Sequence, residues 1–251
     1  MPEGEYGPST YGDRIAQPFD RSFVPDDERE AARFLAKLAG AGPALELGIG
    51  TGRVALPLAR RGVEVHGIDA SEAMVAKLRE KRGGRDIPVT IGDFAAVKIK
   101  GRYPLVFVVF NTFFAPLTQE EQIRCFANVA KGLTPGGAFV VEAFVPDLTR
   151  FDRGQRTDAF DVTVDMVRLD VTVHDPIEQR ITGQHVVITE NGVKLYPFQM
   201  RYAWPSEMDL MANLAGMQLR DRFGGWREEP FTSESDRHVS VYERATHGGR
   251  S

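Results

Sequence analysis

The chain has 251 residues, of which 42% are hydrophobic and 26% are charged. This is the composition of a globular protein with a sizeable core, and the length suits either one elaborated domain or two small ones. The 35 acidic residues outnumber the 31 basic residues, which gives a net charge of −4. That sign argues against a protein whose partner is nucleic acid.

The cysteine, histidine and hydropathy patterns indicate which cofactors and which cellular compartment suit the protein. Cys125 is the single cysteine, so the chain can form no internal disulfide, and a reducing compartment suits it. The five histidines lack metal-ligand spacing, and no metal is expected. The polar N-terminus and the lack of an 18-residue apolar run predict no signal peptide and no membrane partner. We therefore expect a cytoplasmic protein.

The first 25 residues mix turn-forming residues with scattered aromatic residues, which predicts an N-terminal flap with one short helix. A helix is predicted from Asp27 to Gly40, because apolar residues recur there at helical spacing. Asp27 is expected to cap this helix, with Glu30 as its capping-box partner.

A parallel βαβ unit is predicted next. Residues 43–47 form a short apolar strand that runs into the glycine-rich segment 48–52, and a helix follows as far as Gly62. Residues 63–69 form a second strand, after which Ser71 caps another helix.

The same alternation continues along the chain. Strands are predicted at residues 87–91, 105–110 and 138–145, with a helix at 118–133 that begins with a Thr118–Glu121 capping box. Strands that alternate with helices are typical of a doubly wound parallel sheet, so the predicted fold class is α/β.

After the fifth strand, the pattern changes to strict two-residue alternation, which is typical of antiparallel strands. Asn191-Gly192 is the strongest hairpin signal in this stretch. We therefore expect an antiparallel β insertion over residues 150–202, serving as an acceptor lid or a dimer surface. A helix from Ser206 and two more strands then complete a main domain made of residues 26–149 and 203–245.

The glycine-rich segment between the first strand and the next helix is the most informative part of the sequence. Glycines 48, 50 and 52 let a ligand approach the backbone closely while N–H groups of the helix face it. The spacing departs from the dinucleotide fingerprint because Arg53 stands where its third glycine belongs. Glu46 would repel a pyrophosphate but suits a ligand with a sulfonium or ammonium group, which points to S-adenosylmethionine.

Five short motifs in this order resemble those of the class I S-adenosylmethionine-dependent methyltransferases. They are Glu46-x-Gly48-x-Gly50-x-Gly52, Asp69, Gly92-Asp93-Phe94, Phe110-Asn111 and Pro135-Gly136-Gly137. The resemblance implies a Rossmann-like, doubly wound, seven-stranded and mostly parallel sheet with the insertion placed after the fifth strand.

The resemblance also implies a cofactor site. The glycine turn would pass under the methionine part of the cofactor, Asp69 would accept from the ribose hydroxyls, and Asp93 with Phe94 would hold the adenine. Tyr11 and Arg14 of the leading segment would cover the cofactor. The complete set of expected cofactor residues is Tyr11, Arg14, Glu46, Gly48, Gly50, Gly52, Asp69, Ala70, Met74, Asp93, Phe94 and Phe110.

Three of these residues also have purely structural interpretations. Asp69 could cap the following helix, although Ser71 is better placed to do so. Asp93 could be a turn residue, and Phe94 could be an ordinary core aromatic.

The sequence offers three candidates for catalytic residues. Asn111 ends the fourth strand, where it could orient the acceptor, although asparagine at a strand end is also a common turn former. His174 and His185 lie on inserted strands and could serve as a base if the acceptor needs one. Both could equally be surface strand residues.

These observations predict an enzyme that moves a methyl group from S-adenosylmethionine to an N or O atom of a small molecule by in-line displacement. The insertion resembles that of N-methyltransferases of amino sugars. Two alternatives stay open, namely an inactive S-adenosylmethionine-binding protein and a nucleotide-dependent oxidoreductase. The chain could also form a homodimer.

Overall fold

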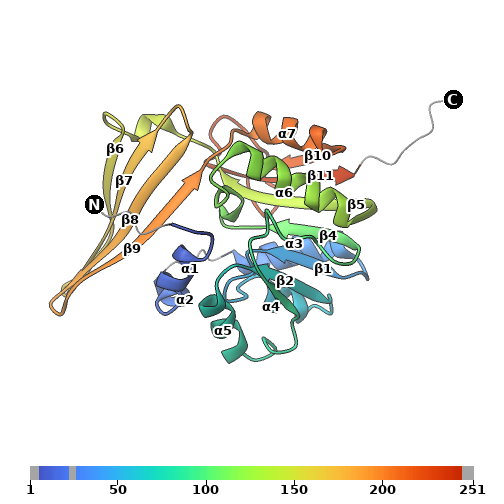
Figure 1. Ribbon diagram of the computed structural model, residues 1–251, viewed down its shortest axis with the longest axis horizontal. Coiled ribbons are helices and arrows are strands. Elements are labelled where there is room, and N and C mark those ends of the chain that lie inside the picture. Colours follow the sequence, from blue (N-terminus) through green and yellow to red (C-terminus); the bar gives the residue numbers. More distant parts are fainter. Residues whose placement is uncertain (1–5, 23–26, 245–251) are drawn as a thin grey trace.

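The larger of two β-sheets forms the centre of the molecule (Figure 1). The computed structural model describes residues 6–22 and 27–244. The first sheet has seven strands in the order β10-β11-β5-β4-β1-β2-β3. Its strands are β1 (Ala44–Leu47), β2 (Val65–Asp69), β3 (Val89–Ile91), β4 (Tyr103–Val108), β5 (Leu133–Phe144), β10 (Met217–Phe223) and β11 (Arg237–Arg244).

Strands β1 to β5 pair in parallel, whereas β11 runs antiparallel between β5 and β10. The connecting helices are α3 (Glu28–Ala39), α4 (Ala55–Ala59), α5 (Glu72–Glu80), α6 (Gln119–Gly132) and α7 (Pro205–Leu214), with short 3-10 turns η1 (Thr112–Phe114) and η2 (Leu148–Arg150). The predicted Rossmann-like, doubly wound sheet with an insertion after its fifth strand is confirmed.

Strand β4 shows why the sheet is covered on both faces. Val106 and Val108 are buried in one apolar cluster with residues of α6 and α7. Leu105 and Phe107 point the other way, into a second cluster with residues of α3 and α4. Successive side chains of a strand alternate between its faces, so a continuous apolar strand requires helices on both sides.

Helix starts follow the sequence in two cases and differ in a third. Ser71 caps α5 by accepting from the backbone N–H of Met74, and Thr118 with Glu121 forms the capping box of α6. Asp27 precedes α3 but makes no side-chain cap. Its carboxylate instead accepts from Arg237 Nη1 at 2.5 Å, because a charged partner forms a stronger hydrogen bond than a backbone amide. The predicted Asp27 cap is therefore wrong.

The second sheet contains four antiparallel strands in sequence order, all within the expected insertion. They are β6 (Gln155–Val162), β7 (Met166–Asp175), β8 (Arg180–Thr189) and β9 (Gly192–Arg201). The β8–β9 hairpin turns at Asn191-Gly192, as predicted. Strand β6 was not predicted, because its polar sequence shows little alternation.

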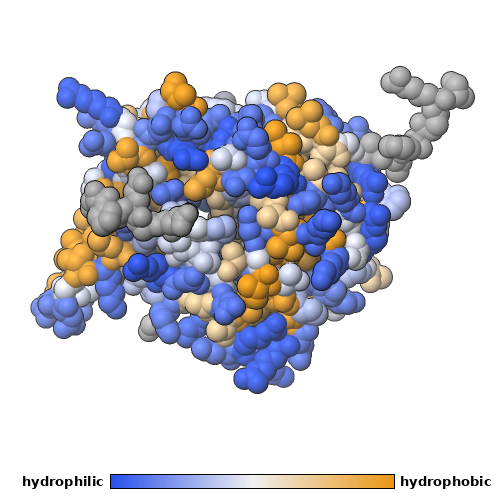
Figure 2. All heavy atoms as spheres, viewed as in Figure 1, coloured by the Kyte–Doolittle hydropathy of each residue, from blue (hydrophilic) through white to orange (hydrophobic). Residues whose placement is uncertain are grey.

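The two faces of the second sheet differ in chemistry. Asp170, His185 and Phe198 share the face that looks toward the first sheet's crevice. Val171, Val173 and other apolar side chains lie on the opposite face and are substantially exposed. Figure 2 shows apolar side chains gathered on the side of the molecule where these hairpins lie.

Helices α1 (Thr10–Ile15) and α2 (Phe19–Ser22) lie between the two sheets (Figure 1), and α1 packs beside α5 and β9. Asp13 of α1 accepts from the hydroxyl of Ser71 at 2.7 Å. The hydroxyl of Tyr6 accepts from the backbone N–H of Gln199 on the edge strand β9 at 3.1 Å. The predicted flap thus contains two short helices, although its residues 1–5 and 23–25 lie outside the described part of the chain.

No helix within the described ranges has the length and apolar character needed to cross a membrane.

Replacing Gly12 with alanine should loosen α1. A Cβ at this position would lie 2.6 Å from Cβ of Ser71, which real side chains do not allow, so the helix must shift away from α5. We expect faster amide hydrogen exchange over residues 10–15 in the Gly12→Ala variant. Gly7→Ala is the matched control, since a Cβ there meets nothing within 4 Å. Equal exchange in both variants would contradict the close packing of α1 on α5.

Candidate functional site

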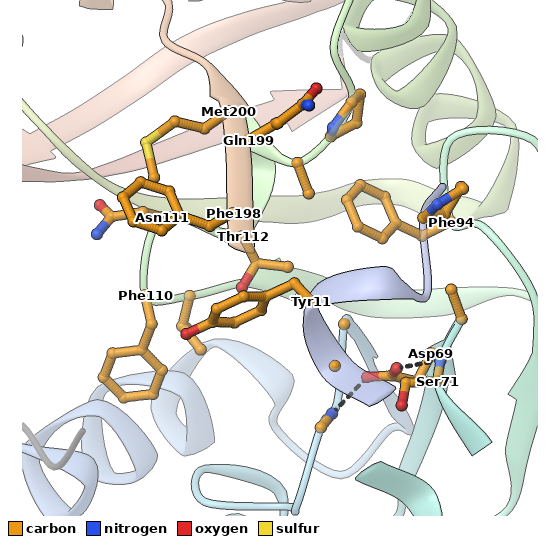
Figure 3. A pocket seen from close by; sticks show the side chains of 18 of the residues that line it. Tyr11, Asp69, Ser71, Phe94, Phe110, Asn111, Thr112, Phe198, Gln199 and Met200 are labelled. Atoms are coloured by element: carbon orange, nitrogen blue, oxygen red, sulfur yellow. Dashed lines mark hydrogen bonds between the residues drawn. The ribbon is translucent and has the colours of Figure 1, made fainter. Parts of the chain in front are cut away.

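A cavity of about 1070 Å³ lies where the first sheet, α1 and the second sheet meet. It opens at the carboxyl ends of the parallel strands, which is where doubly wound folds bind their ligands. Most of the residues predicted for the site line it, namely Tyr11, Glu46, Gly48, Gly50, Asp69, Ala70, Met74, Asp93, Phe94, Phe110, Asn111 and His185. Figure 3 shows Tyr11 projecting into the same space as Phe110, Asn111 and Thr112.

Gly48 allows the turn after β1 to pass close to the end of β4. Its φ of +69° is a left-handed conformation, and a Cβ would lie 2.4 Å from Cγ2 of Thr112. Both the backbone conformation and the lack of space therefore require glycine. Gly52 does not line the cavity and packs beside Leu78 instead.

Asp69 joins the glycine turn to the start of α5. One carboxylate oxygen accepts from the backbone N–H of Gly50 at 2.6 Å, and the other accepts from the N–H of Ser71 at 2.8 Å (Figure 3). Burial raises the pKa of Asp69, while these two backbone bonds oppose the rise. A carboxylate has about four acceptor positions, so Asp69 retains capacity for the hydroxyls of a ligand.

Glu46 brings a buried acidic group to the floor of the cavity. The residue is 2% exposed, and its Oε2 atom has no hydrogen-bond partner among the described residues. Burial, reinforced by the charge of Asp69, raises the pKa of Glu46 well above its usual value. A buried acceptor of this kind is costly unless a donor or a cation reaches it. The ammonium group of S-adenosylmethionine has the chemistry that this position needs.

Asp93 and Phe94 each make structural contacts and also line the cavity. Asp93 accepts from the backbone N–H of Ala95 at 2.8 Å, as a turn residue does, and it also lines the cavity. Phe94 is 7% exposed and belongs to the core cluster around β4, yet it contributes to the cavity wall as well.

Two consecutive left-handed residues end the β4 segment. Phe110 has a φ of +54° and Asn111 a φ of +65°. The side-chain oxygen of Asn111 accepts from the backbone N–H of Phe144 at 2.7 Å. The amide orientation is thereby set, because only the oxygen can accept, and the NH₂ group remains as a donor. Asn111 is therefore suited to bind an oxygen atom of a ligand.

Glu142 supports this unusual backbone and was missed in the sequence. It is buried on β5, where it accepts from the N–H of Phe110 at 3.0 Å and from the indole N–H of Trp226 at 3.1 Å. Arg237 contributes a third bond at 3.2 Å. Burial raises the pKa of Glu142. An acidic residue within the apolar run of β5 was the available signal.

Arg53 explains the departure from the dinucleotide fingerprint. Its guanidinium lies over the ring of Phe110, 4.4 Å from the ring centre, and it lines the cavity. A cation at this distance is attracted to the face of an aromatic ring. The residue therefore joins the glycine turn to the end of β4.

Arg14 and His174 do not line this cavity. Arg14 borders a smaller cavity of about 440 Å³ between α1 and the insertion. His174 lies four residues beyond Asp170 on β7, where it stacks on Phe151 and bonds to the hydroxyl of Tyr202. We leave both residues out of the proposed site.

Some residues of the insertion line the cavity, and others hold the insertion against the main domain. Phe198 lines the cavity, whereas Arg201 is buried at the junction with the main domain. Arg201 donates there to Gln122 and Glu207, at 2.6 and 2.8 Å. Within the described ranges, no group of three or more His, Cys, Asp or Glu side chains is arranged to hold a metal ion.

The raised pKa of Glu46 predicts a specific pH dependence of stability. Above its ordinary pKa of 4.5, Glu46 ionises in the unfolded chain but resists ionisation in the fold, so its contribution to stability falls as pH rises. A Glu46→Gln variant lacks this loss. The difference between its free energy of unfolding and that of the wild type should therefore increase, by up to about 1.4 kcal/mol per pH unit above 4.5.

Chemical denaturation of the ligand-free protein between pH 4 and about 8 measures this difference. Glu80→Gln, at an exposed acid on α5, is the control and should run parallel to the wild type. Parallel curves for Glu46→Gln would contradict the raised pKa.

Comparisons with known proteins agree with this geometry. Residues 44–137 match the family model described as a methyltransferase domain. The cypemycin N-terminal methyltransferase of a Streptomyces species is 30% identical over 201 residues, covering 80% of this chain and 82% of the relative.

Solved structures extend the likeness to the whole chain. The CcbJ methyltransferase from Streptomyces caelestis is 43% identical, with a TM-score of 0.92 over 96% of this chain and 100% of its own. The amino pentose methyltransferase CalS10 from Micromonospora echinaspora shares the fold, with a TM-score of 0.69 and 20% identity over 98% of this chain and 100% of its own. The chain belongs to the class I S-adenosylmethionine-dependent methyltransferases.

Proposed function

We propose that this enzyme methylates an amine nitrogen of a small-molecule acceptor that binds between the sheet crevice and the insertion. The observation that carries the proposal is the size and position of the cavity. At about 1070 Å³ it exceeds the roughly 300–1000 Å³ typical of a site for one ligand, and it extends from the glycine turn to the polar face of the insertion. A donor and an acceptor can therefore occupy it together.

The lining of the cavity suits a nitrogen that carries or develops positive charge. Aromatic rings of Phe144, Phe160 and Phe198 line it together with the carboxylates of Asp170 and Asp236. Ring faces and carboxylates both stabilise cations. Arg150 and Arg180 line the cavity as well, which suits an amine carried on a polar scaffold.

The relatives support an amine for a separate reason. The cypemycin methyltransferase is named for an N-terminus, and CalS10 for an amino pentose. These descriptions concern those proteins. For the present chain they indicate which compounds to try first, namely peptides with a free N-terminus and amino sugars.

Different residues of this chain would position S-adenosylmethionine and the acceptor. S-Adenosylmethionine supplies a methyl group bonded to a positively charged sulfur. Glu46 and Asp69 would hold its charged and hydroxyl groups, and Tyr11 would cover it. The NH₂ group of Asn111 would orient the acceptor through one of its oxygen atoms. In-line transfer requires this alignment and the exclusion of water.

The oxidoreductase alternative is set aside, since the chain belongs to the methyltransferases. Turnover on an acceptor is the direct test of the proposed activity. We expect transfer of labelled methyl from S-adenosylmethionine to short peptides with a free α-amine or to amino pentoses. The same compounds with acetylated amines are the controls and should not react. Methylation of hydroxyl acceptors alone would contradict the amine proposal.

Replacing Asp69 with alanine should weaken cofactor binding. The variant loses the ribose acceptor and both backbone bonds to Gly50 and Ser71. Loss of the two hydrogen bonds from the ribose hydroxyls corresponds to roughly 30- to 150-fold weaker binding of S-adenosylhomocysteine. Titration calorimetry measures this. Asp86→Ala, at an exposed acid of the same region, is the control, and equal affinities in the two variants would remove Asp69 from the cofactor site.

A further inference from the structure

His185 and Asp170 face each other across neighbouring strands of the insertion. They are directly opposed in the register of β7 and β8. His185 Nδ1 lies 2.5 Å from a carboxylate oxygen of Asp170. Both residues line the cavity. The main cavity thus contains a histidine–carboxylate pair on the wall that the insertion forms.

Aromatic neighbours fix the imidazole of His185 in place. The ring of Phe198 stacks on it with centres 4.5 Å apart and an angle of 25° between the planes. Tyr11 of α1 meets it edge-on at 6.0 Å. Phe198 in turn depends on Gly183, where a Cβ would lie 2.6 Å from the ring. With its side chain 14% exposed, His185 is held mostly away from solvent.

The bond to Asp170 selects one tautomer of His185. An ionised carboxylate can only accept, so Nδ1 must donate. The neutral imidazole then carries its lone pair on Nε2, where it can receive a proton. A carboxylate that holds a histidine in this way keeps the ring in the state that a base requires.

We propose that His185 is the catalytic base that removes the proton from the acceptor amine, and that Asp170 is its positioning residue. This inference rests on the proposed function. Amines are mostly protonated at neutral pH, since a peptide α-amine has a pKa of about 8 and an alkyl amine a pKa of about 10, and a protonated nitrogen has no lone pair for attack. A base in the cavity removes that obstacle.

The proposed step is balanced. The N–H bond of the ammonium breaks and its proton forms a bond to Nε2 of His185, so the electron pair stays on nitrogen. That pair forms the new bond to the methyl carbon while the C–S bond breaks and its electrons remain on sulfur. The imidazolium is stabilised by Asp170 and afterwards releases its proton to solvent.

Several groups around the ring set the electrostatic field that it experiences. Asp170 faces it from β7, Tyr196 from β9 and Tyr11 from α1. Arg168 lies on the same face of β7, two residues from Asp170. Asp170 is the acid hydrogen-bonded to the imidazole, which makes it the partner to vary.

Three variants test the proposal on the amine that reacts fastest in the panel of peptides and amino pentoses. At pH 7, His185→Gln should lower kcat/KM at least about 100-fold, and Asp170→Asn about 10-fold or more. His66→Gln is the matched control, because His66 also bonds to a carboxylate, that of Glu64, but lies outside the cavity. The affinity for S-adenosylhomocysteine should stay within about twofold in all three, which separates a chemical defect from misfolding.

The pH profile separates a base from a merely structural residue. The deficit of His185→Gln should shrink as pH rises past the pKa of the acceptor amine, about 8 for a peptide α-amine, because the amine then loses its proton to solvent without help. A deficit that stays constant with pH, or turnover equal to that of the wild type at pH 7, would overturn the assignment.

Nitrogen NMR of the labelled, ligand-free enzyme gives a readout that needs no acceptor. Neutral His185 should carry its proton on Nδ1 in the wild type, and Asp170→Asn should lose this preference. A wild-type proton on Nε2 would overturn the proposal. If the wild type methylates no amine of the panel, the proposed function fails. The NMR result still shows whether Asp170 sets the tautomer of His185.

Discussion

The carboxylate of Asp69 is the interaction on which the site depends. Its two oxygens bind the backbone of the glycine turn and the first residue before α5, so a single side chain sets the distance between the first two βα connections. Ser71, held in this way, caps α5 and bonds to Asp13 of α1. On the side of α5, the helix that covers the cavity is therefore held in place through one buried acid at the end of β2.

Periodicity and turn chemistry predicted the main sheet because each of its elements carries a local signal. The apolar run at β4, the capping box of α6 and the Asn191-Gly192 turn are all decided by residues within a few positions of one another. Asp27 failed as a predicted cap for the complementary reason. Its partner, Arg237, is 210 residues away, and no local pattern reveals such a pair.

The site was predictable at residues that the local backbone conformation requires and that also line the cavity, such as Gly48 and Asp69. It was not predictable where tertiary contacts decide. Asp170 was missed because its importance depends on the β7–β8 register, which follows from the turn after Asp175. Arg14 and His174 share an element with residues that line the cavity but do not line it themselves. The chemical type of a side chain alone does not show which residues of an element line the cavity.

The attachment of α1 at both ends has a consequence for exchange of ligands. Tyr6 is bonded to the edge of the insertion, and Asp13 to the cap of α5, so this six-residue helix bridges the two walls of the cavity. A helix this short has little stability of its own, so it depends on these two hydrogen bonds and on the packing of Ile15 against Met74. Because each sheet is held by its own strand pairing, a movement of this helix would change the wall of the cavity and leave both sheets intact.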